Sequence, residues 1–195
     1  MKRFLFGTLL MSVAALPAMA ALRQGESAPK FTAQASLAGK TFTFSLKKAL
    51  RKGPVVVYFY PSAYTGGCDL EAHTFAQDSE KFRSAGATII GVSLDSIQRL
   101  NDFSADPNYC AGKFPTASDT GGAIAKSYQV EVHQGPPGLK DVRGVDIGHG
   151  FADRTTFVIA RDGKIVSVIS QVSPEEHVAK ALQVVQHLHM KSQGA

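Results

Sequence analysis

The sequence predicts a single α/β domain, because two apolar runs with the character of buried strands flank a stretch of helical periodicity. The runs span residues 55–60 and 87–92, and their near-continuous apolar character is typical of parallel strands covered on both faces. Between them, apolar side chains recur at helical spacing from Cys68 to Phe82. The chain has 195 residues, 44% of them hydrophobic, which is enough for one domain with a substantial core.

An N-terminal hairpin and a second helix are predicted on either side of this β-α-β unit. Residues 29–31 and 41–44 are β-prone and are separated by a turn at residues 38–40. After the second core strand, Ser96 can cap a helix that ends before Pro107. The hairpin would therefore precede the core, and the capped helix would follow its second strand.

Weaker signals in the middle of the chain indicate an insertion. Residues 115–118 are predicted to form a short strand and residues 122–128 a short helix. The stretch 134–138 that follows is rich in glycine and proline, which is typical of a loop.

Order returns in a C-terminal hairpin and a last helix. Residues 155–160 and 164–170 read as strands joined by Asp162-Gly163, a tight-turn signature. Ser173 then opens a helix with proline at its first position and glutamate at its third. The order β-α-β, insertion, β-β-α predicts a thioredoxin-like fold with an N-terminal hairpin and a central insertion.

The first 20 residues have the features of a secretory signal peptide. Lys2 and Arg3 precede an apolar stretch over residues 4–16, and Ala18-Met19-Ala20 forms an Ala-x-Ala cleavage site. The apolar stretch is short for a membrane span, so an uncleaved anchor is the weaker alternative. We expect a signal peptide over residues 1–20, a mature domain over 21–195 without stable membrane association, and export to the periplasm of a Gram-negative bacterium.

The charge balance gives no indication of a nucleic-acid partner. Without Lys2 and Arg3, the 21 basic residues become 19 against 16 acidic ones, a net charge of +3. The basic residues are also scattered along the chain, a pattern typical of solvated faces rather than of a phosphate-binding stripe.

Cys68 is placed where the first core strand turns into a helix, and it is one of only two cysteines. Unpaired amides and the helix dipole in a first helical turn favour a thiolate. Oxidoreductases with a thioredoxin-like fold usually carry two cysteines in this loop, but Thr65 replaces the first of them here. Dithiol exchange within the loop is therefore excluded, whereas Thr65 and the amides of Gly67 and Cys68 could bind a small oxygen compound.

The motif around this cysteine resembles the signature of the peroxiredoxins. Pro61, Thr65 and Cys68 follow the first core strand as Pro-x-x-x-Thr-x-x-Cys. Arg154, directly before the strand at 155, resembles the active-site arginine of that family, and Glu71 stands where relatives of the bacterioferritin-comigratory, or peroxiredoxin Q, type carry a glutamate. Gly67 stands where many relatives have proline. The likeness covers roughly the whole mature chain.

This resemblance implies a thiol-dependent peroxidase without cofactor or metal. The Cys68 thiolate would attack the O–O bond of hydrogen peroxide or an organic hydroperoxide and become a sulfenic acid. Arg154 would lower the thiol pKa and, with Thr65, polarise the peroxide. Pro61 would cover the sulfur and Glu71 would orient the arginine. Taken singly, Pro61 could merely end a strand and Arg154 could be a surface residue.

The resemblance also suggests that Cys110 resolves the sulfenic acid and that a thioredoxin-like thiol donor completes the cycle. Some peroxiredoxins carry an intramolecular resolving cysteine in this region, although the position matches only loosely. A buried spectator thiol is the alternative. His73 occupies the spot where other relatives carry their resolving cysteine, and His149 could line the pocket. The chain is expected to be a monomer or a dimer.

Two other functions stay open on the sequence alone. One is an exported thiol- or copper-handling assembly protein on the same fold, which would need a second thiol close to the first. The other is a binding or chaperone protein with a vestigial site, against which the intact Thr65 and Arg154 argue.

Overall fold

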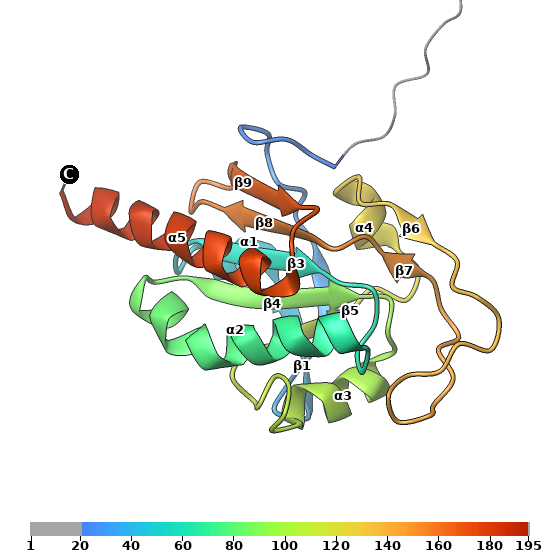
Figure 1. The fold of residues 1–195 in the computed structure, drawn as a ribbon. Helices are drawn as coiled ribbons and strands as arrows, with labels where there is room; N and C mark the ends of the chain where they lie inside the picture. The colour runs from blue at the N-terminus through green and yellow to red at the C-terminus, as the bar shows by residue number, and fades with distance from the viewer. Residues whose placement is uncertain (1–20, 195) are drawn as a thin grey trace, which may run out of the picture.

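A seven-stranded mixed sheet with helices on both faces forms the protein in the computed structural model, which describes residues 21–194 (Figure 1). The expected signal peptide and its cleavage site therefore lie outside the described residues. The helices are α1 (Leu46–Leu50), α2 (Gly66–Ser84), α3 (Ile97–Ala105), α4 (Ala123–Ser127) and α5 (Pro174–Gln193). The strands are β1 (Thr32–Leu37), β2 (Lys40–Ser45), β3 (Val55–Phe59), β4 (Thr88–Ser93), β5 (Thr116–Ser118), β6 (Val132–His133), β7 (Phe151–Ala152), β8 (Thr155–Ile159) and β9 (Ile165–Ser170).

The predicted β-α-β unit and C-terminal hairpin form the centre of the sheet. The strand order is β2-β1-β5-β4-β3-β8-β9, with β3, β4 and β5 parallel to one another and β8 antiparallel to β3. This is the thioredoxin-like arrangement that the sequence predicts. The β3–β8 pairing opposes Phe59 to Thr155, so the end of β3 and the start of β8 lie side by side.

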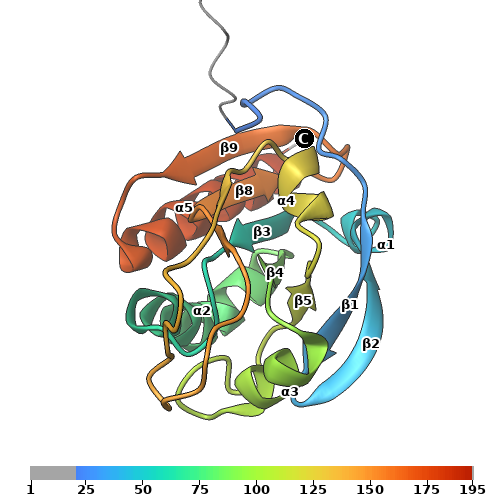
Figure 2. The same cartoon turned by 90° about the vertical axis from the view of Figure 1, so that its right-hand side faces the viewer.

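Side chains of β3 alternate between two apolar cores, one on each face of the sheet. Val56 and Tyr58 point into a core formed with α2 and α5, whereas Val57 and Phe59 point into a core formed with α1 and α4. Figure 2 shows α2 and α5 on one side of the sheet and α1 and α4 on the other. Both faces of β3 are covered, which explains its uninterrupted apolar sequence.

The structure corrects the predicted N-terminal hairpin. Its first strand is Thr32–Leu37, not residues 29–31, and it pairs with β2 on one side and with β5 on the other. The strand has few β-branched or aromatic residues, so its pairing partners rather than its own propensity stabilise it. A short helix, α1, also follows β2 and was not predicted; Ser45 caps it by accepting a hydrogen bond from the amide of Lys48.

The insertion contains a second, two-stranded sheet that the sequence did not predict. β6 and β7 pair antiparallel, with Val132 opposite Ala152 and His133 opposite Phe151. Between them the chain passes beside the loop that precedes α2, where the amide of Val142 donates to the carbonyl of Tyr64 at 3.0 Å. The insertion therefore contacts the segment that carries the motif.

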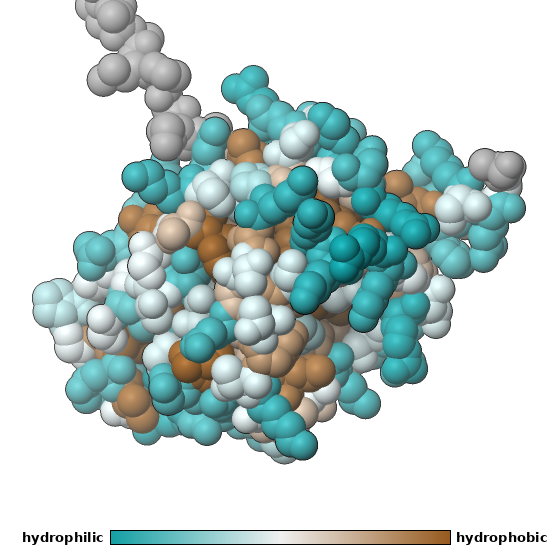
Figure 3. Space-filling model, turned by 180° about the vertical axis from the view of Figure 1, so that it is seen from behind, coloured by the Kyte–Doolittle hydropathy of each residue, from teal (hydrophilic) through white to brown (hydrophobic). Residues whose placement is uncertain are grey.

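The last two features of the fold are the polarity of one face and the length and apolar character of the helices. Seen from behind, the molecule is largely hydrophilic, with apolar residues in small groups between polar ones (Figure 3). None of the helices that the structure describes is long and apolar enough to cross a membrane.

Candidate active site

The loop after β3 delivers Cys68 into the first turn of α2. Tyr64 has a left-handed backbone conformation, with φ of 60°, and Thr65 is extended, so the chain reverses direction before the helix begins. The amide of Cys68 donates to the carbonyl of Thr65 at 2.8 Å, and the Thr65 hydroxyl donates to the carbonyl of Ser62 at 2.7 Å. Cys68 is 3% exposed.

Arg154 joins the two acidic groups of the site, Cys68 and Glu71. Its Nη2 lies 3.3 Å from Sγ of Cys68, and its Nη1 donates to Oε2 of Glu71. Arg154 reaches both because it directly precedes β8, whose first residue is paired with the end of β3. The structure thus brings together Thr65, Cys68, Glu71 and Arg154, four residues that the motif predicts to share a site.

The balance of influences on the Cys68 thiol differs from the sequence-based expectation. Burial raises the pKa of the Cys68 thiol and outweighs the Arg154 guanidinium and the hydrogen bonds of Ser62 and Thr65, which lower it. Arg154 lowers the pKa of the thiol as predicted and Ser62 was not predicted to do so, but the net direction of the pKa is opposite to the prediction. A cation beside a buried sulfur still favours the thiolate over the thiol compared with the same pocket without Arg154.

Gly67 and Pro61 border the site on its exposed side. A β-carbon on Gly67 would lie 3.2 Å from Nη2 of Arg154 and 3.6 Å from Cγ of Pro174. The missing side chain at position 67 therefore leaves room for the guanidinium. Pro61 is half-buried at the end of the β3 segment, ahead of Ser62.

Asp95 is a site residue that the sequence did not reveal. It lies just beyond β4 and is fully buried; it accepts hydrogen bonds from the Ala63 amide at 2.8 Å and from the Ser62 hydroxyl at 3.0 Å. Nε2 of His149 lies 2.9 Å from the same carboxylate. His149 therefore supports the active-site loop through Asp95.

Charged residues connect the insertion to the same loop. Arg99 forms ion pairs of 2.8 Å with both Asp95 and Asp141, although its Nε lacks hydrogen-bond alignment toward Asp95. Arg143 stacks on the Tyr64 ring, with its guanidinium carbon 3.3 Å from the ring centroid. The turn before Cys68 is thus held from two sides.

Cys110 is a buried free thiol in the same apolar core as Cys68. Burial raises its pKa well above the ordinary value. It follows α3, next to Tyr109, which stacks on Phe103 at 5.3 Å and meets the Tyr64 ring edge-on at 5.4 Å. An aromatic cluster therefore connects the Cys110 segment to the loop before Cys68.

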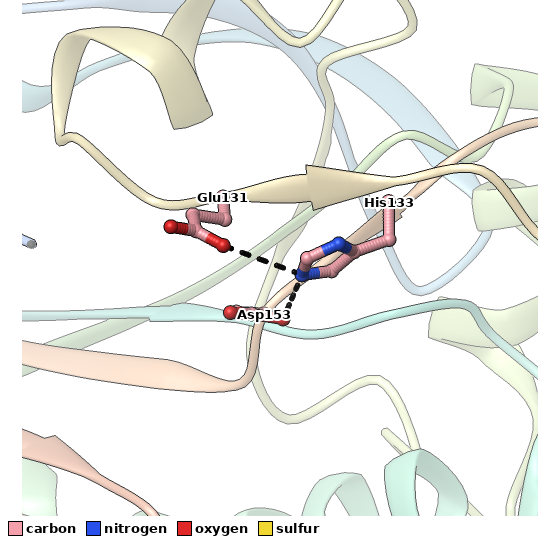
Figure 4. Close-up of side chains that lie close together, drawn as sticks. All are labelled: Glu131, His133 and Asp153. Carbon is pink, nitrogen blue, oxygen red and sulfur yellow. Dashed lines mark ion pairs between the residues drawn. The ribbon is translucent and has the colours of Figure 1, made fainter. Parts of the chain in front are cut away.

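Three exposed side chains form an ion-pair cluster beside Arg154. Nε2 of His133 lies 3.0 Å from Asp153 and 3.7 Å from Glu131 (Figure 4). Each of the three side chains could offer one ligand atom to a cation, but both carboxylates already face the same imidazole nitrogen. The cluster links β6 to the residue that precedes Arg154.

His73 is exposed on α2, with its Nδ1 3.0 Å from the carbonyl of Asn108.

The fold is thioredoxin-like, and one cysteine lies in the first turn of the helix after the central strand with an arginine against its sulfur. Together these features define the class of thiol-dependent peroxidases. Comparison with known proteins agrees with this class. The model of the AhpC/TSA family matches residues 24–168. The chain therefore belongs to the AhpC/TSA family, the peroxiredoxins, and is a peroxidase.

Relatives of the peroxiredoxin Q type are among the similar proteins. Chloroplastic peroxiredoxin Q of Populus jackii is 31% identical over 170 residues, which cover 87% of this chain and 70% of the poplar protein. The crystal structure of peroxidoxin BcpB from Mycobacterium tuberculosis has a TM-score of 0.71 and 29% identity, covering 85% of this chain and 97% of that one. The bacterioferritin comigratory protein of Xanthomonas campestris, described for its alkyl peroxide reduction activity, has a TM-score of 0.63 and 27% identity over 80% of this chain and 91% of its own.

Proposed function

We propose that the chain reduces hydrogen peroxide and organic hydroperoxides through Cys68. The thiolate sulfur attacks one peroxide oxygen, an S–O bond forms and the O–O bond breaks. The bonding electron pair passes to the leaving oxygen, which takes up a proton and departs as water or alcohol. Cys68 loses the two electrons that the peroxide gains and becomes a sulfenic acid.

One observation carries this proposal: Nη2 of Arg154 lies 3.3 Å from Sγ of Cys68. Negative charge starts on sulfur and develops on the leaving oxygen, and a fixed cation beside both positions stabilises this transfer. The 3% exposure of Cys68 keeps water away and makes that charge interaction strong. Thr65 borders the same turn, and Glu71 holds the other arm of the guanidinium. We propose that Pro61 covers the sulfur of Cys68 and limits the access of water.

Cys110 is proposed as the resolving cysteine. Its thiol would attack the sulfenic sulfur, forming a disulfide and releasing water. Support comes from the shared core of the two thiols and from their link through Tyr64 and Tyr109. Because both sulfurs are buried and unbridged, the bridge requires the segment that carries Cys110 to rearrange. Two thiols of an external thioredoxin-like donor would then reduce the disulfide.

The compartment and the assembly state are further proposals. The basic head and Ala-x-Ala site of residues 1–20 support export to the periplasm, with mature protein starting at Ala21. N-terminal sequencing of the protein recovered from a periplasmic fraction checks this: an intact Met1 start would contradict it. We propose that the mature chain is a monomer or a dimer. Sedimentation velocity measures its size in solution, and a dominant species larger than a dimer would contradict this proposal.

Mass spectrometry under non-reducing conditions tests the reaction. After one equivalent of hydrogen peroxide, the wild-type chain should lose two free thiols and two mass units, with a Cys68–Cys110 linked peptide. A persistent sulfenic or sulfinic Cys68 with a free Cys110 would contradict the resolving role. Reaction of Cys68 no faster than that of free cysteine would contradict the peroxidatic role. Comparing hydrogen peroxide with a bulky alkyl hydroperoxide measures the substrate preference.

A further inference from the structure

Behind Arg154, the site continues into a buried polar cluster formed with α5. Glu71 is fully buried, and its Oε2 accepts from Arg154. Its other oxygen, Oε1, has no hydrogen-bond partner within residues 21–194. Burial raises the pKa of Glu71 to about 7, against the Arg154 charge that lowers it. The carboxyl group therefore carries a proton for part of the time near neutral pH.

A side chain that could serve this oxygen is His177. Its Nδ1 lies 4.0 Å from Oε1 of Glu71 and 2.9 Å from the hydroxyl of Thr156, and the imidazole is fully buried. Nε2 of His177 has no hydrogen-bond partner in the described part of the chain. Three elements, α2, β8 and α5, thus enclose a chain of polar groups that runs from Cys68 to Thr156.

This histidine is costly at its position. The buried residues of α5 besides His177 are apolar, namely Val178, Ala181, Leu182 and Val185. Burying polar atoms without partners destabilises a fold by about 1 to 3 kcal/mol for each group, so an apolar side chain would suit this stripe better. The imidazole faces the Thr156 hydroxyl and the unpartnered oxygen of Glu71, and only Glu71 contacts Arg154.

We propose that His177 is a positioning residue of the peroxidase: its Nδ1 holds Oε1 of Glu71 by a hydrogen bond, so that Oε2 keeps the Arg154 guanidinium fixed against Cys68. When Glu71 is protonated, its hydroxyl donates to Nδ1 of His177. When Glu71 is ionised, an Nδ1–H imidazole donates to Oε1. Because Nδ1 has a single lone pair or a single hydrogen, this hydrogen bond replaces the one that Nδ1 makes with the Thr156 hydroxyl at 2.9 Å. Closing the separation from 4.0 Å to a hydrogen bond requires a movement of about 1 Å. The inference rests on Cys68 being the attacking sulfur.

The charges around the pair agree with a neutral imidazole. Burial and the nearby Arg154 and Lys180 lower the pKa of His177 to about 4, while Glu176 acts in the opposite direction. Glu71 pairs with Arg154, and its charge adds to burial in raising the pKa of Tyr58, on β3, well above its ordinary value. A neutral His177 beside a Glu71 that is protonated for part of the time, with Arg154 charged, is then the state of the cluster at neutral pH.

Two substitutions of His177 separate positioning from packing. His177→Leu places an apolar side chain in the apolar stripe and should leave the melting temperature unchanged or higher. It should nevertheless slow Cys68 oxidation about tenfold, since a misplacement of 1 Å can cost on the order of 100-fold in rate. His177→Asn keeps an amide nitrogen close to the place of Nδ1 and should recover most of the rate. His187→Leu, at an exposed position of the same helix, is the control.

The rate is measured as the second-order constant for loss of the Cys68 thiol with hydrogen peroxide. In parallel, ¹³C-carboxyl NMR of labelled glutamate follows the titration of Glu71. Loss of the hydrogen bond from His177 should shift the Glu71 titration in His177→Leu, and His177→Asn should return it toward wild type. A slow wild-type Cys68 would contradict the proposed function itself. A fast wild type with an equally fast His177→Leu, or with His177→Asn no faster than His177→Leu, would overturn the positioning role alone.

Discussion

Gly67 and Arg154 approach each other so closely that a β-carbon on the glycine would lie 3.2 Å from Nη2 of the arginine. That nitrogen is the one that contacts Sγ of Cys68. The arginine occupies space that most other residues at position 67 would fill.

Gly67→Ala should therefore slow Cys68 oxidation while stabilising the protein. Alanine favours a helix over glycine by up to about 1 kcal/mol, but its methyl group pushes the guanidinium away from the sulfur. Gly66→Ala is a matched control, because a β-carbon there meets no atom within 4 Å. Both variants should melt at or above the wild-type temperature, and only Gly67→Ala should lose rate. Equal rates in the two variants would refute this account of the glycine.

Arg154→Gln should reduce the rate constant for Cys68 oxidation by about 100-fold, the usual effect of removing one group that stabilises developing negative charge. It should also raise the pKa of the Cys68 thiol further, because the guanidinium lowers that pKa in the folded protein. Thiolate absorbance at 240 nm as a function of pH measures the second effect. Arg161→Gln, at an exposed position, should behave as wild type.

Cys68→Ser should abolish turnover, whereas Cys110→Ser should retain the first oxidation and lose the intramolecular disulfide. Stopped-flow measurement of a single turnover, followed by trapping of the sulfenic acid with dimedone, distinguishes the two. If both variants fail to react with the first equivalent of peroxide, the two cysteines do not have separate roles.

Asp95→Asn should destabilise the fold by about 3 kcal/mol or more, because removing the charge of a buried ion pair leaves His149 without its carboxylate and Arg99 with Asp141 alone. Asp146→Asn is the control. Asp146 pairs with Lys140 on the surface, and such a pair contributes at most about 1 kcal/mol. Urea denaturation of both variants gives the comparison, and an Asp95→Asn effect as small as the control would contradict the buried network.

The contribution of His149 to stability should depend on pH. Burial works to lower the pKa of His149, but Asp95 outweighs it, so the folded pKa is raised above the unfolded value of about 6.5. This contribution is fully present below pH 6.5 and is lost as the pH rises through the folded pKa. The difference in unfolding free energy between wild type and His149→Asn should therefore be larger at pH 6 than at pH 9. A difference that grows with pH would contradict this assignment.

The sequence was sufficient for the core of the fold and for the residues around the sulfur. Long apolar runs predicted β3 and β4, and the capping box at Ser173 predicted the start of α5, where both of its hydrogen bonds are present. The motif predicted that Cys68, Glu71 and Arg154 share a site because residues of these types are expected at the ends of particular strands and helices.

What the sequence could not predict depends on neighbours that are distant in the chain. β1 has weak strand propensity and forms because β2 and β5 flank it. Asp95 reads as a polar residue after a strand, and only the folded chain brings the Ala63 amide and His149 to it. His177 is hidden in an apolar helical stripe, and nothing local shows that Glu71 faces it. The net pKa of Cys68 also depends on burial, which motif residues alone do not measure.

The aromatic packing around the two thiols makes the protein its own optical reporter. The chain has no tryptophan and five tyrosines. Four of them, Tyr58, Tyr60, Tyr64 and Tyr109, belong to or pack against the core that holds both sulfurs. The proposed bridge would move Tyr109, next to Cys110, relative to Phe103 and Tyr64, so intrinsic ultraviolet emission should report its formation in real time without a dye.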